Sequence, residues 1–352
     1  MLACIVRGAA VRGAQAWRQQ VGITSRDVAR LAGVSQPTVS RALRGDERVS
    51  AATRAKVREA ARALGYVPSE AGRSLSTSTS RRIGVLVTDL TNPFYPHLVG
   101  PLHDELGRLD YRMMLFTERT DEALAYERLL DRSIDGVVLA TTTLGSDLPA
   151  ELRRRELPFV YLNREGGTPG DAVVVDNRRG AGFAARELVG LGHERIAGIF
   201  GPEDTSTGRD REYGLRLALA EAGIGLPESR VRRGPFEFDT GYAGLTGLLA
   251  SSEPPTAVFC GNDVIAIGAL DAARRFGVRV PDDLTVIGFD DIPMASWASF
   301  ELTTVRYDLG EMAATAVRML IDRITGKAGD EPARVVLDPE FVPRHTHAAP
   351  PA

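Results

Sequence analysis

The spacing of apolar residues along the chain changes near residue 80. Before it, apolar side chains such as Val28, Ala29 and Val39 recur at the three-to-four-residue interval of short amphipathic helices. After it, they form short continuous runs separated by helical stretches, the first being Ile83-Gly-Val-Leu-Val87. Such runs are typical of strands buried in a parallel sheet. The pattern predicts an all-α head followed by a larger α/β body.

The first helix of the head has a clear start. Thr24 and Asp27 have the spacing of a capping box, in which a threonine and an acidic residue three positions later satisfy each other's backbone amides. This predicts a helix from Ser25 to Leu31 that buries Val28, Ala29 and Leu31, and that stops before Gly33.

Two more helices follow in the head. Ser35 is placed to cap a helix over 36–43, with Pro37 in the first turn, where a missing amide proton costs little. A third helix is expected from Ser50 to about Leu64, ending at Gly65.

The first two helices have the spacing of a helix-turn-helix. Ala29 is small enough for a close crossing, Gly33 permits the tight turn, and Val39 packs between the helices. Arginine can contact guanine, glutamine can contact adenine, and hydroxyls can hold phosphates. The outward face of the second helix carries Gln36, Pro37, Ser40, Arg41 and Arg44. The alternative is a small bundle whose basic face is only solvated.

The body contains two series of strand-like runs. The first series is 83–87, 113–116, 136–140 and 159–162, and after Asp176 the rhythm restarts with 196–200, 257–260 and 286–289. The expected fold class is therefore α/β, with two doubly wound parallel lobes behind an all-α head. Such lobes place a ligand cleft at the carboxyl ends of their strands.

Charge separates the head from the body. The whole chain has a net charge of −3, yet residues 23–80 carry ten basic and five acidic side chains. A small basic head on an acidic body suggests that nucleic acid binds at one end only. No apolar stretch is long enough to span a membrane, and 1–20 lacks a signal-peptide core, so we expect a cytoplasmic protein. Its two cysteines, Cys4 and Cys260, are expected to be free thiols.

The head resembles that of the lactose-repressor (LacI/GalR) family. The resemblance rests on the segment from Thr24 to Leu43, on Val49-Ser-Ala-Ala-Thr-Arg-Ala-Lys-Val57 and on Leu64-Gly-Tyr-Val-Pro68, and it extends over about 23–345. It implies a homodimeric repressor on a near-palindromic DNA operator, with a periplasmic-binding-protein-like sensor. Base contacts are implied for Gln36, Pro37 and Arg41, and phosphate contacts or supporting roles for Ser35, Thr38, Arg48, Ser50, Thr53 and Tyr66. Further DNA-binding candidates are Thr24, Ser25, Ser40 and Arg44.

The resemblance also divides the chain. It implies an extension without regular structure at 1–22, a headpiece at 23–68, a hinge at 69–80 and a sensor at 81–347. In the hinge, Arg73 would bind in the minor groove and Leu75 would wedge between base steps, which bends the duplex toward more protein surface. The implied lobes are 81–175 with 307–333, and 176–306 with 334–347.

Polar and aromatic residues gather where the predicted strands end. They include Asp89, Asn92, Tyr95, Arg164 and Thr205. Those that match effector positions of the family, together with Thr207, are Phe94, Thr142, Asn163, Asp176, Arg211, Phe236, Asn262 and Asp290. Carboxylate, guanidinium and aromatic groups together suit a sugar or a related polyol. Simpler alternatives are that Asp176 caps a helix, Phe94 joins a core and Asp290 caps a turn.

Other chemistries have weak support. The chain lacks a phosphate-binding glycine loop and a nucleophile elbow, and its five histidines lack ligand spacing. We therefore expect no catalytic site, no metal site and no cofactor. Two alternatives remain: a sensor that answers to a protein partner, and, less compatible with the head, a sugar-binding transport protein.

Overall fold

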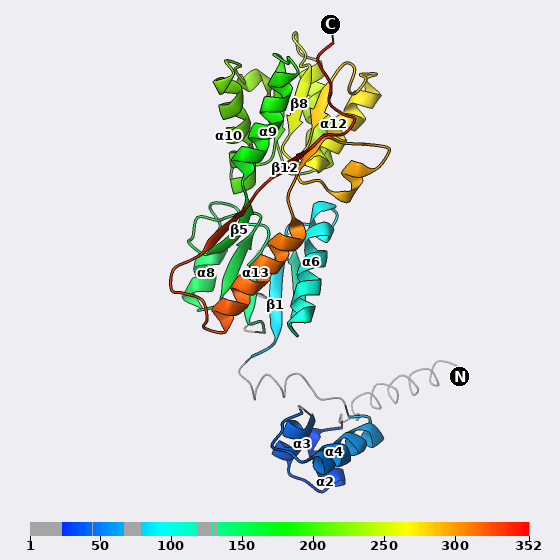
Figure 1. Cartoon of the computed structure of the whole chain (residues 1–352), viewed down its shortest axis with the longest axis vertical. Coiled ribbons are helices and arrows are strands. Elements are labelled where there is room, and N and C mark those ends of the chain that lie inside the picture. Colours follow the sequence, from blue (N-terminus) through cyan, green and yellow to red (C-terminus); the bar gives the residue numbers. More distant parts are fainter. Residues whose placement is uncertain (1–22, 44, 67–78, 118–128, 130–132, 352) are drawn as a thin grey trace, which may run out of the picture. The chain divides into compact units, whose positions relative to one another are not determined.

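A computed structural model describes residues 23–43, 45–66, 79–117, 129 and 133–351, and these fall into two compact units, 1–80 and 81–352 (Figure 1). In the first unit the described residues form three helices, α2 (Ser25–Ala32), α3 (Gln36–Leu43) and α4 (Ala51–Leu64). The predicted helical head and α/β body are both confirmed.

The headpiece core is built from residues of all three helices. Val28, Val39 and Val57 are fully buried, and Gly33 ends α2 in the left-handed conformation at φ 66°. The Asp27 carboxylate accepts a hydrogen bond from the Thr24 backbone N–H at 3.0 Å. One expectation is wrong: Leu31 is 56% exposed, because it lies on the side of α2 that faces neither α3 nor α4.

The second unit contains a six-stranded sheet that forms lobe one. Its order is β11-β5-β4-β3-β1-β2, and every neighbouring pair is parallel. The bounds are β1 (Arg82–Val87), β2 (Arg112–Thr117), β3 (Gly136–Leu139), β4 (Phe159–Leu162), β5 (Asp171–Val175) and β11 (Arg334–Leu337).

Alternate residues of these strands face opposite layers. Val85 and Val138 pack with the side chains of α6 (Phe94–Arg108) and α13 (Leu309–Ile324), whereas Leu86 and Leu139 pack with those of α8 (Leu148–Arg154). This two-sided burial explains why the strands appear in the sequence as continuous apolar runs.

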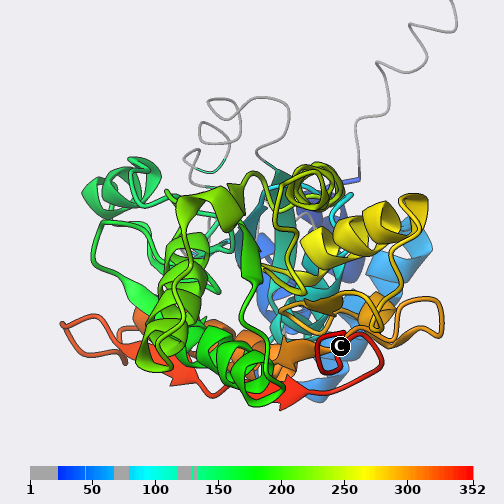
Figure 2. The ribbon, with the colours of Figure 1, turned by 90° about the horizontal axis from the view of Figure 1, so that it is seen from above.

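Lobe two is a second parallel sheet, in the order β7-β6-β8-β9. Seen from above, α9 (Asn177–Gly190) and α10 (Ser206–Glu221) lie together, and α11 (Phe238–Leu249) and α12 (Asp263–Arg275) form another pair (Figure 2). The strand bounds are β6 (Ile196–Phe200), β7 (Val231–Arg233), β8 (Ala257–Cys260) and β9 (Thr285–Ile287), with short 3-10 helices at Glu228–Arg230 and Pro293–Ser296. Both lobes are doubly wound, as predicted.

The boundary between the lobes differs from the expected one. Strand β11 pairs with β5, so 334–337 belong to lobe one and not to lobe two. The chain returns to lobe two through β12 (Glu340–Val342), which pairs antiparallel with β10 (Thr304–Arg306). The apolar pattern of Arg334-Val-Val-Leu337 suits either sheet, and only the free edge of β5 decides between them.

The C-terminal segment lies along the edge strand β9. The Val286 N–H donates to the Thr346 carbonyl at 2.8 Å, and the Thr346 hydroxyl donates to the Val286 carbonyl at 2.7 Å. Buried His193 donates through Nε2 to the Ala348 carbonyl at 2.8 Å, while its Nδ1 accepts from Thr256 at 2.9 Å. The segment thereby covers the edge of the sheet.

Candidate DNA interface and effector cleft

One face of α3 is exposed. Val39 and Ala42 are buried against α2 and α4, which leaves Gln36, Pro37 and Arg41 exposed. The Gln36 side-chain amide donates to the Ser25 hydroxyl at 2.9 Å, so part of its hydrogen-bonding capacity is already used within the headpiece.

The hydroxyl residues expected near phosphates sit at two helix starts. The Ser35 hydroxyl accepts from the Thr38 N–H at 3.4 Å, and the Ser50 hydroxyl accepts from the Thr53 N–H at 3.2 Å. In each pair the two hydroxyls also contact each other, at 2.8 and 2.9 Å. The N-terminus of a helix offers free amides and a positive dipole end, which are suitable for a phosphate.

Arg48 is engaged within the headpiece. Its Nε and Nη2 donate to the two oxygens of Asp46 at 3.0 and 2.8 Å, and these bonds lower the pKa of the Asp46 carboxyl to about 2. A phosphate contact from Arg48 would therefore have to share or replace this ion pair.

The remaining DNA candidates have no common position. Thr24 is exposed at the cap of α2, Ser40 is half-buried on α3, and Tyr66 packs against the headpiece core. Arg44, Arg73 and Leu75 lie outside the described residues, so the hinge wedge stays a prediction.

A cavity of about 460 Å³ lies between the lobes, at the carboxyl ends of their strands. Its position agrees with the switch-point rule for doubly wound sheets. Its walls include Asn92, Tyr95 and Arg164 from lobe one, and Pro202, Phe236 and Met294 from lobe two.

Arg164 and Phe236 meet across this cavity. The Arg164 guanidinium lies 4.8 Å from the centre of the Phe236 ring, and Asn92 Nδ2 donates to the Phe236 carbonyl at 2.8 Å. The Nε atom of Arg164 is buried and has no hydrogen-bond partner among the described residues. A buried, unsatisfied donor costs free energy, and the arginine that carries it lines the cavity.

Arg211 and Asp290 form a buried ion pair beside the cleft. Arg211 is 2% exposed and donates to Asn177 Oδ1 at 2.8 Å, to the Gly261 carbonyl at 2.6 Å and to Asp290 Oδ1 at 2.9 Å. Its guanidinium also lies 3.8 Å from the centre of the Phe289 ring. Each of the three guanidinium nitrogens thus has a hydrogen-bond partner within the protein.

Asp290 is held in an uncommon conformation. Its φ is 111°, and the Tyr307 hydroxyl donates to the same Oδ1 at 3.0 Å. Burial raises the pKa of its carboxyl above the usual range, and the charge of Arg211 partly offsets that rise. Tyr307 also lies 3.4 Å from Asn163 Oδ1, so it links residues of the two lobes.

The other predicted effector residues divide into two groups. Asp176 caps α9 by accepting from the Arg179 N–H at 3.0 Å, and Asn262 caps α12 by accepting from the Ile265 N–H at 2.9 Å. Phe94 belongs to the core of lobe one. By contrast, Thr142 and Thr207 are buried polar residues, and Thr207 Oγ1 has no partner in the described part of the chain.

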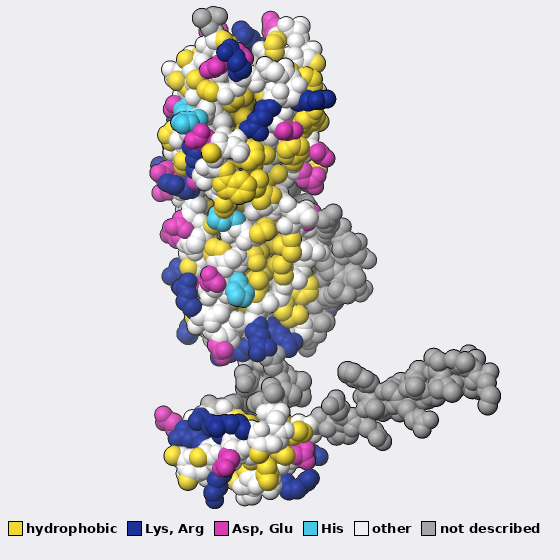
Figure 3. All heavy atoms as spheres, turned by 90° about the vertical axis from the view of Figure 1, so that its right-hand side faces the viewer, with side chains coloured by type: hydrophobic (Ala, Val, Ile, Leu, Met, Phe, Trp, Pro, Cys, Tyr) yellow, Lys and Arg dark blue, Asp and Glu magenta, His cyan; other side chains and the backbone are white. Residues whose placement is uncertain are grey.

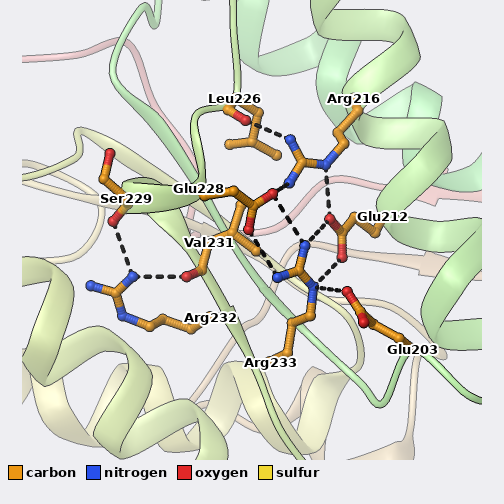
Figure 4. A network of polar contacts seen from close by, with 9 residues as sticks. All are labelled: Glu203, Glu212, Arg216, Leu226, Glu228, Ser229, Val231, Arg232 and Arg233. Atoms are coloured by element: carbon orange, nitrogen blue, oxygen red, sulfur yellow. Dashed lines mark hydrogen bonds and ion pairs between the residues drawn. The ribbon is translucent and has the colours of Figure 1, made fainter.

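A charged network supports the wall that carries Phe236 (Figure 4). Arg233, at the end of β7, donates to Glu212 of α10 at 2.8 Å and to Glu228 at 3.0 Å, and its Nε lies 2.8 Å from Glu203. Glu212 and Glu228 raise the pKa of the Arg233 guanidinium. The network fixes β7 to the helix that presents Arg211.

The sequence did not single out every residue around the Arg211–Asp290 ion pair. Tyr307, Asn177 and Phe289 were missed, because a tyrosine on a crossing segment and residues beside a predicted strand carry no motif. Arg164 was noted as a strand-end residue only. Within the described residues there is no cluster of side chains that could hold a metal ion.

A helix-turn-helix headpiece on a two-lobed domain with an interlobe cavity defines a class of ligand-responsive DNA-binding regulators. The model for bacterial regulatory proteins of the lacI family matches residues 24–69, and that for a periplasmic binding protein-like domain matches 185–347. The transcriptional regulator CelR of Thermobifida fusca is 36% identical over 331 residues, which are 91% of this chain and 96% of CelR. The chain belongs to the LacI family of bacterial regulatory proteins.

Solved structures agree with this assignment. A CelR–cellobiose complex has 34% identity and a TM-score of 0.71, and covers 92% of this chain and 100% of its own. A lac repressor dimer bound to operator and the anti-inducer ONPF has 27% identity and a TM-score of 0.83, and covers 93% of this chain and 99% of its own. No helix in the described ranges is long and apolar enough to cross a membrane.

Proposed function

We propose that this protein is a transcription repressor that binds a near-palindromic operator as a homodimer and is controlled by a carbohydrate held between its lobes. The observation that carries the proposal is that one chain combines an exposed Gln36–Arg41 helix face with an interlobe cavity lined by Arg164 and Phe236. The first feature suits base edges and the second suits sugar hydroxyls.

The DNA part is tested with the protein's own operator. Genomic fragments are first selected by binding to the full chain, and Arg41→Ala is then titrated on the selected site. Losing one bidentate arginine–guanine contact should weaken specific binding by about 1–3 kcal/mol and relax preference at one base pair of each half-site.

Arg62→Ala is the matched control, since Arg62 is an exposed arginine in the last turn of α4. Equal weakening of operator and random DNA by Arg41→Ala would mean that Arg41 contacts phosphate and not a base.

The effector part is tested by calorimetry with a panel of mono- and disaccharides that includes cellobiose, the ligand in the CelR complex. Arg164→Met keeps the length of the side chain and its packing on Phe236 but removes every donor. We expect this substitution to lower the affinity for the sugar that binds best by at least about tenfold.

Arg153→Met serves as control, because Arg153 is an exposed arginine of the same lobe. A panel in which no sugar binds, or an Arg164 variant that binds like the parent, would contradict the proposed effector class or the role of Arg164.

The proposed homodimer is supported by apolar side chains on the surface of the second unit. Hydrophobic side chains gather over both lobes on one face of the second unit (Figure 3). Contiguous exposed apolar surface is typical of a protein interface. Analytical ultracentrifugation of the full chain at micromolar concentration should show a mass of twice 37.9 kDa.

A further inference from the structure

Asp263 is a fully buried carboxylate that has no place in the site as described so far. It is the first residue of α12 and follows Asn262, the cap of that helix. No cation pairs with it among the described residues, and the negative charges of Asp290 and Asp291 act on it. A buried acid of this kind is costly unless its hydrogen bonds are well satisfied.

Its two oxygens bind two different segments. Oδ2 accepts from the Ile292 N–H at 2.9 Å, and Oδ1 accepts from the Thr304 hydroxyl at 2.5 Å. Ile292 ends the turn that carries Asp290, whereas Thr304 begins β10, the strand that crosses between the lobes. The Asp263 backbone N–H also donates to the Phe289 carbonyl at 2.8 Å.

The turn at 288–292, here called the Asp290 turn, depends on such support. Asp290 and Asp291 both have positive φ values, 111° and 51°, which L-residues seldom adopt unless their surroundings enforce them. A Cβ atom at Gly288 would lie 2.2 Å from Asp263 Oδ1, so the glycine leaves the space that the carboxylate occupies. The Gly288 and Asp290 amides donate to the Thr303 and Val305 carbonyls at 2.9 and 2.8 Å.

We propose that Asp263 is a positioning residue that couples the Asp290 turn to the crossing strand β10, so that a displacement of one is transmitted to the other. The inference rests on the proposed effector site, because Asp290 is one of its residues. Effector binding at Asp290 would then act on β10 through the Asp263 carboxyl group as well as through the direct backbone bonds to Thr303 and Val305.

The charged surroundings set how this group works. Burial and the negative charge of Asp290 raise the pKa of the Asp263 carboxyl, and its bonds to Thr304 and Ile292 oppose the rise. Arg211 is engaged by Asp290, and Asp291 pairs with Arg344 at 2.6 Å, so each of these carboxylates has its own arginine. Asp263 therefore acts through hydrogen bonds, and a neutral amide of the same shape can replace it.

The test is hydrogen–deuterium exchange of the full, ligand-free chain, read on peptides that cover 288–296, 303–308 and, as reference, β6. Asp263→Leu removes both acceptors, while Asp263→Asn keeps an acceptor for Ile292 and offers an N–H to the Thr304 hydroxyl. Thr304→Val removes only the Thr304 bond. Asp271→Leu, an exposed position on the same helix, is the control.

We expect Asp263→Leu to speed exchange in both segments by about ten- to a hundredfold with β6 unchanged, and Asp263→Asn to stay within about threefold of the parent. Thr304→Val should speed exchange at 288–296, although the Asp263–Ile292 bond is untouched. Uniform acceleration across lobe two in Asp263→Leu, or an unchanged 288–296 peptide in Thr304→Val, would overturn the coupling. Neither result depends on the identity of the effector, so the proposed function can fail independently.

Discussion

Replacing Arg211 by methionine should be among the most destabilising single changes in lobe two. Methionine retains much of the apolar packing against Phe289 but removes the guanidinium, which is 2% exposed and makes three charge-assisted hydrogen bonds. Breaking a buried ion pair by removing one partner costs about 3–5 kcal/mol, because the other charge stays buried without compensation. We therefore expect at least about 3 kcal/mol lower stability at pH 7.5.

The pH dependence distinguishes this mechanism from lost packing. Without Arg211, the pKa of Asp290, already raised by burial, should rise further. When the pKa of a carboxyl is higher in the folded state than its unfolded value of about 3.8, the folded state binds the proton more tightly than the unfolded state. The folded state is therefore favoured fully at pH values below about 3.8, and this advantage is lost as pH rises through the folded pKa. The decrease in the free energy of unfolding caused by Arg211→Met should therefore become smaller as pH falls from 7.5 to 5, by up to about 1.4 kcal/mol per pH unit.

The assay is urea unfolding of the full chain at pH 5 and pH 7.5, followed by circular dichroism. Arg209→Met, at an arginine on the same helix whose side chain is 51% exposed, should change stability by less than about 0.5 kcal/mol. Adding Asp290→Asn to Arg211→Met should recover stability at pH 7.5. A loss below about 1 kcal/mol, or an equal loss at both pH values, would refute the reasoning.

Three further predictions concern other parts of the chain. Thr24→Ala should cost the headpiece up to about 1 kcal/mol, measured by thermal unfolding, because it removes the hydroxyl that donates to the Asp27 carboxylate at 2.7 Å at the start of α2. Gly241→Ala should prevent native packing of lobe two, because its Cβ would lie 1.8 Å from the Ile265 carbonyl oxygen; loss of the cooperative unfolding transition would report this. Burial lowers the pKa of His193, so stability should fall as pH drops below about 6.5, and His193→Gln should weaken that dependence in a pH series of unfolding curves.

The sequence by itself determined the class of the molecule. The capping box at Thr24, the glycine at position 33 and the apolar spacing of Val39 are local signals, because each depends on residues within one or two helical turns. The strands of the two lobes could likewise be predicted from the sequence, because burial on both faces requires continuous apolar runs. The sequence also singled out Arg211 and Asp290 as effector-site candidates, through their match to the family's effector positions, and the structure pairs them in a buried ion pair.

Tertiary structure decided what depends on residues far apart in the chain. Strand β11 joined lobe one because β5 had a free edge, and Leu31 stayed exposed because the core of the headpiece forms on the other side of α2. The ion pair of Arg211 and Asp290 spans 79 positions, and the bond of Asp263 to Thr304 spans 41. No local pattern records such a pairing, because its strength comes from burial and from alignment that only the packed sheets provide.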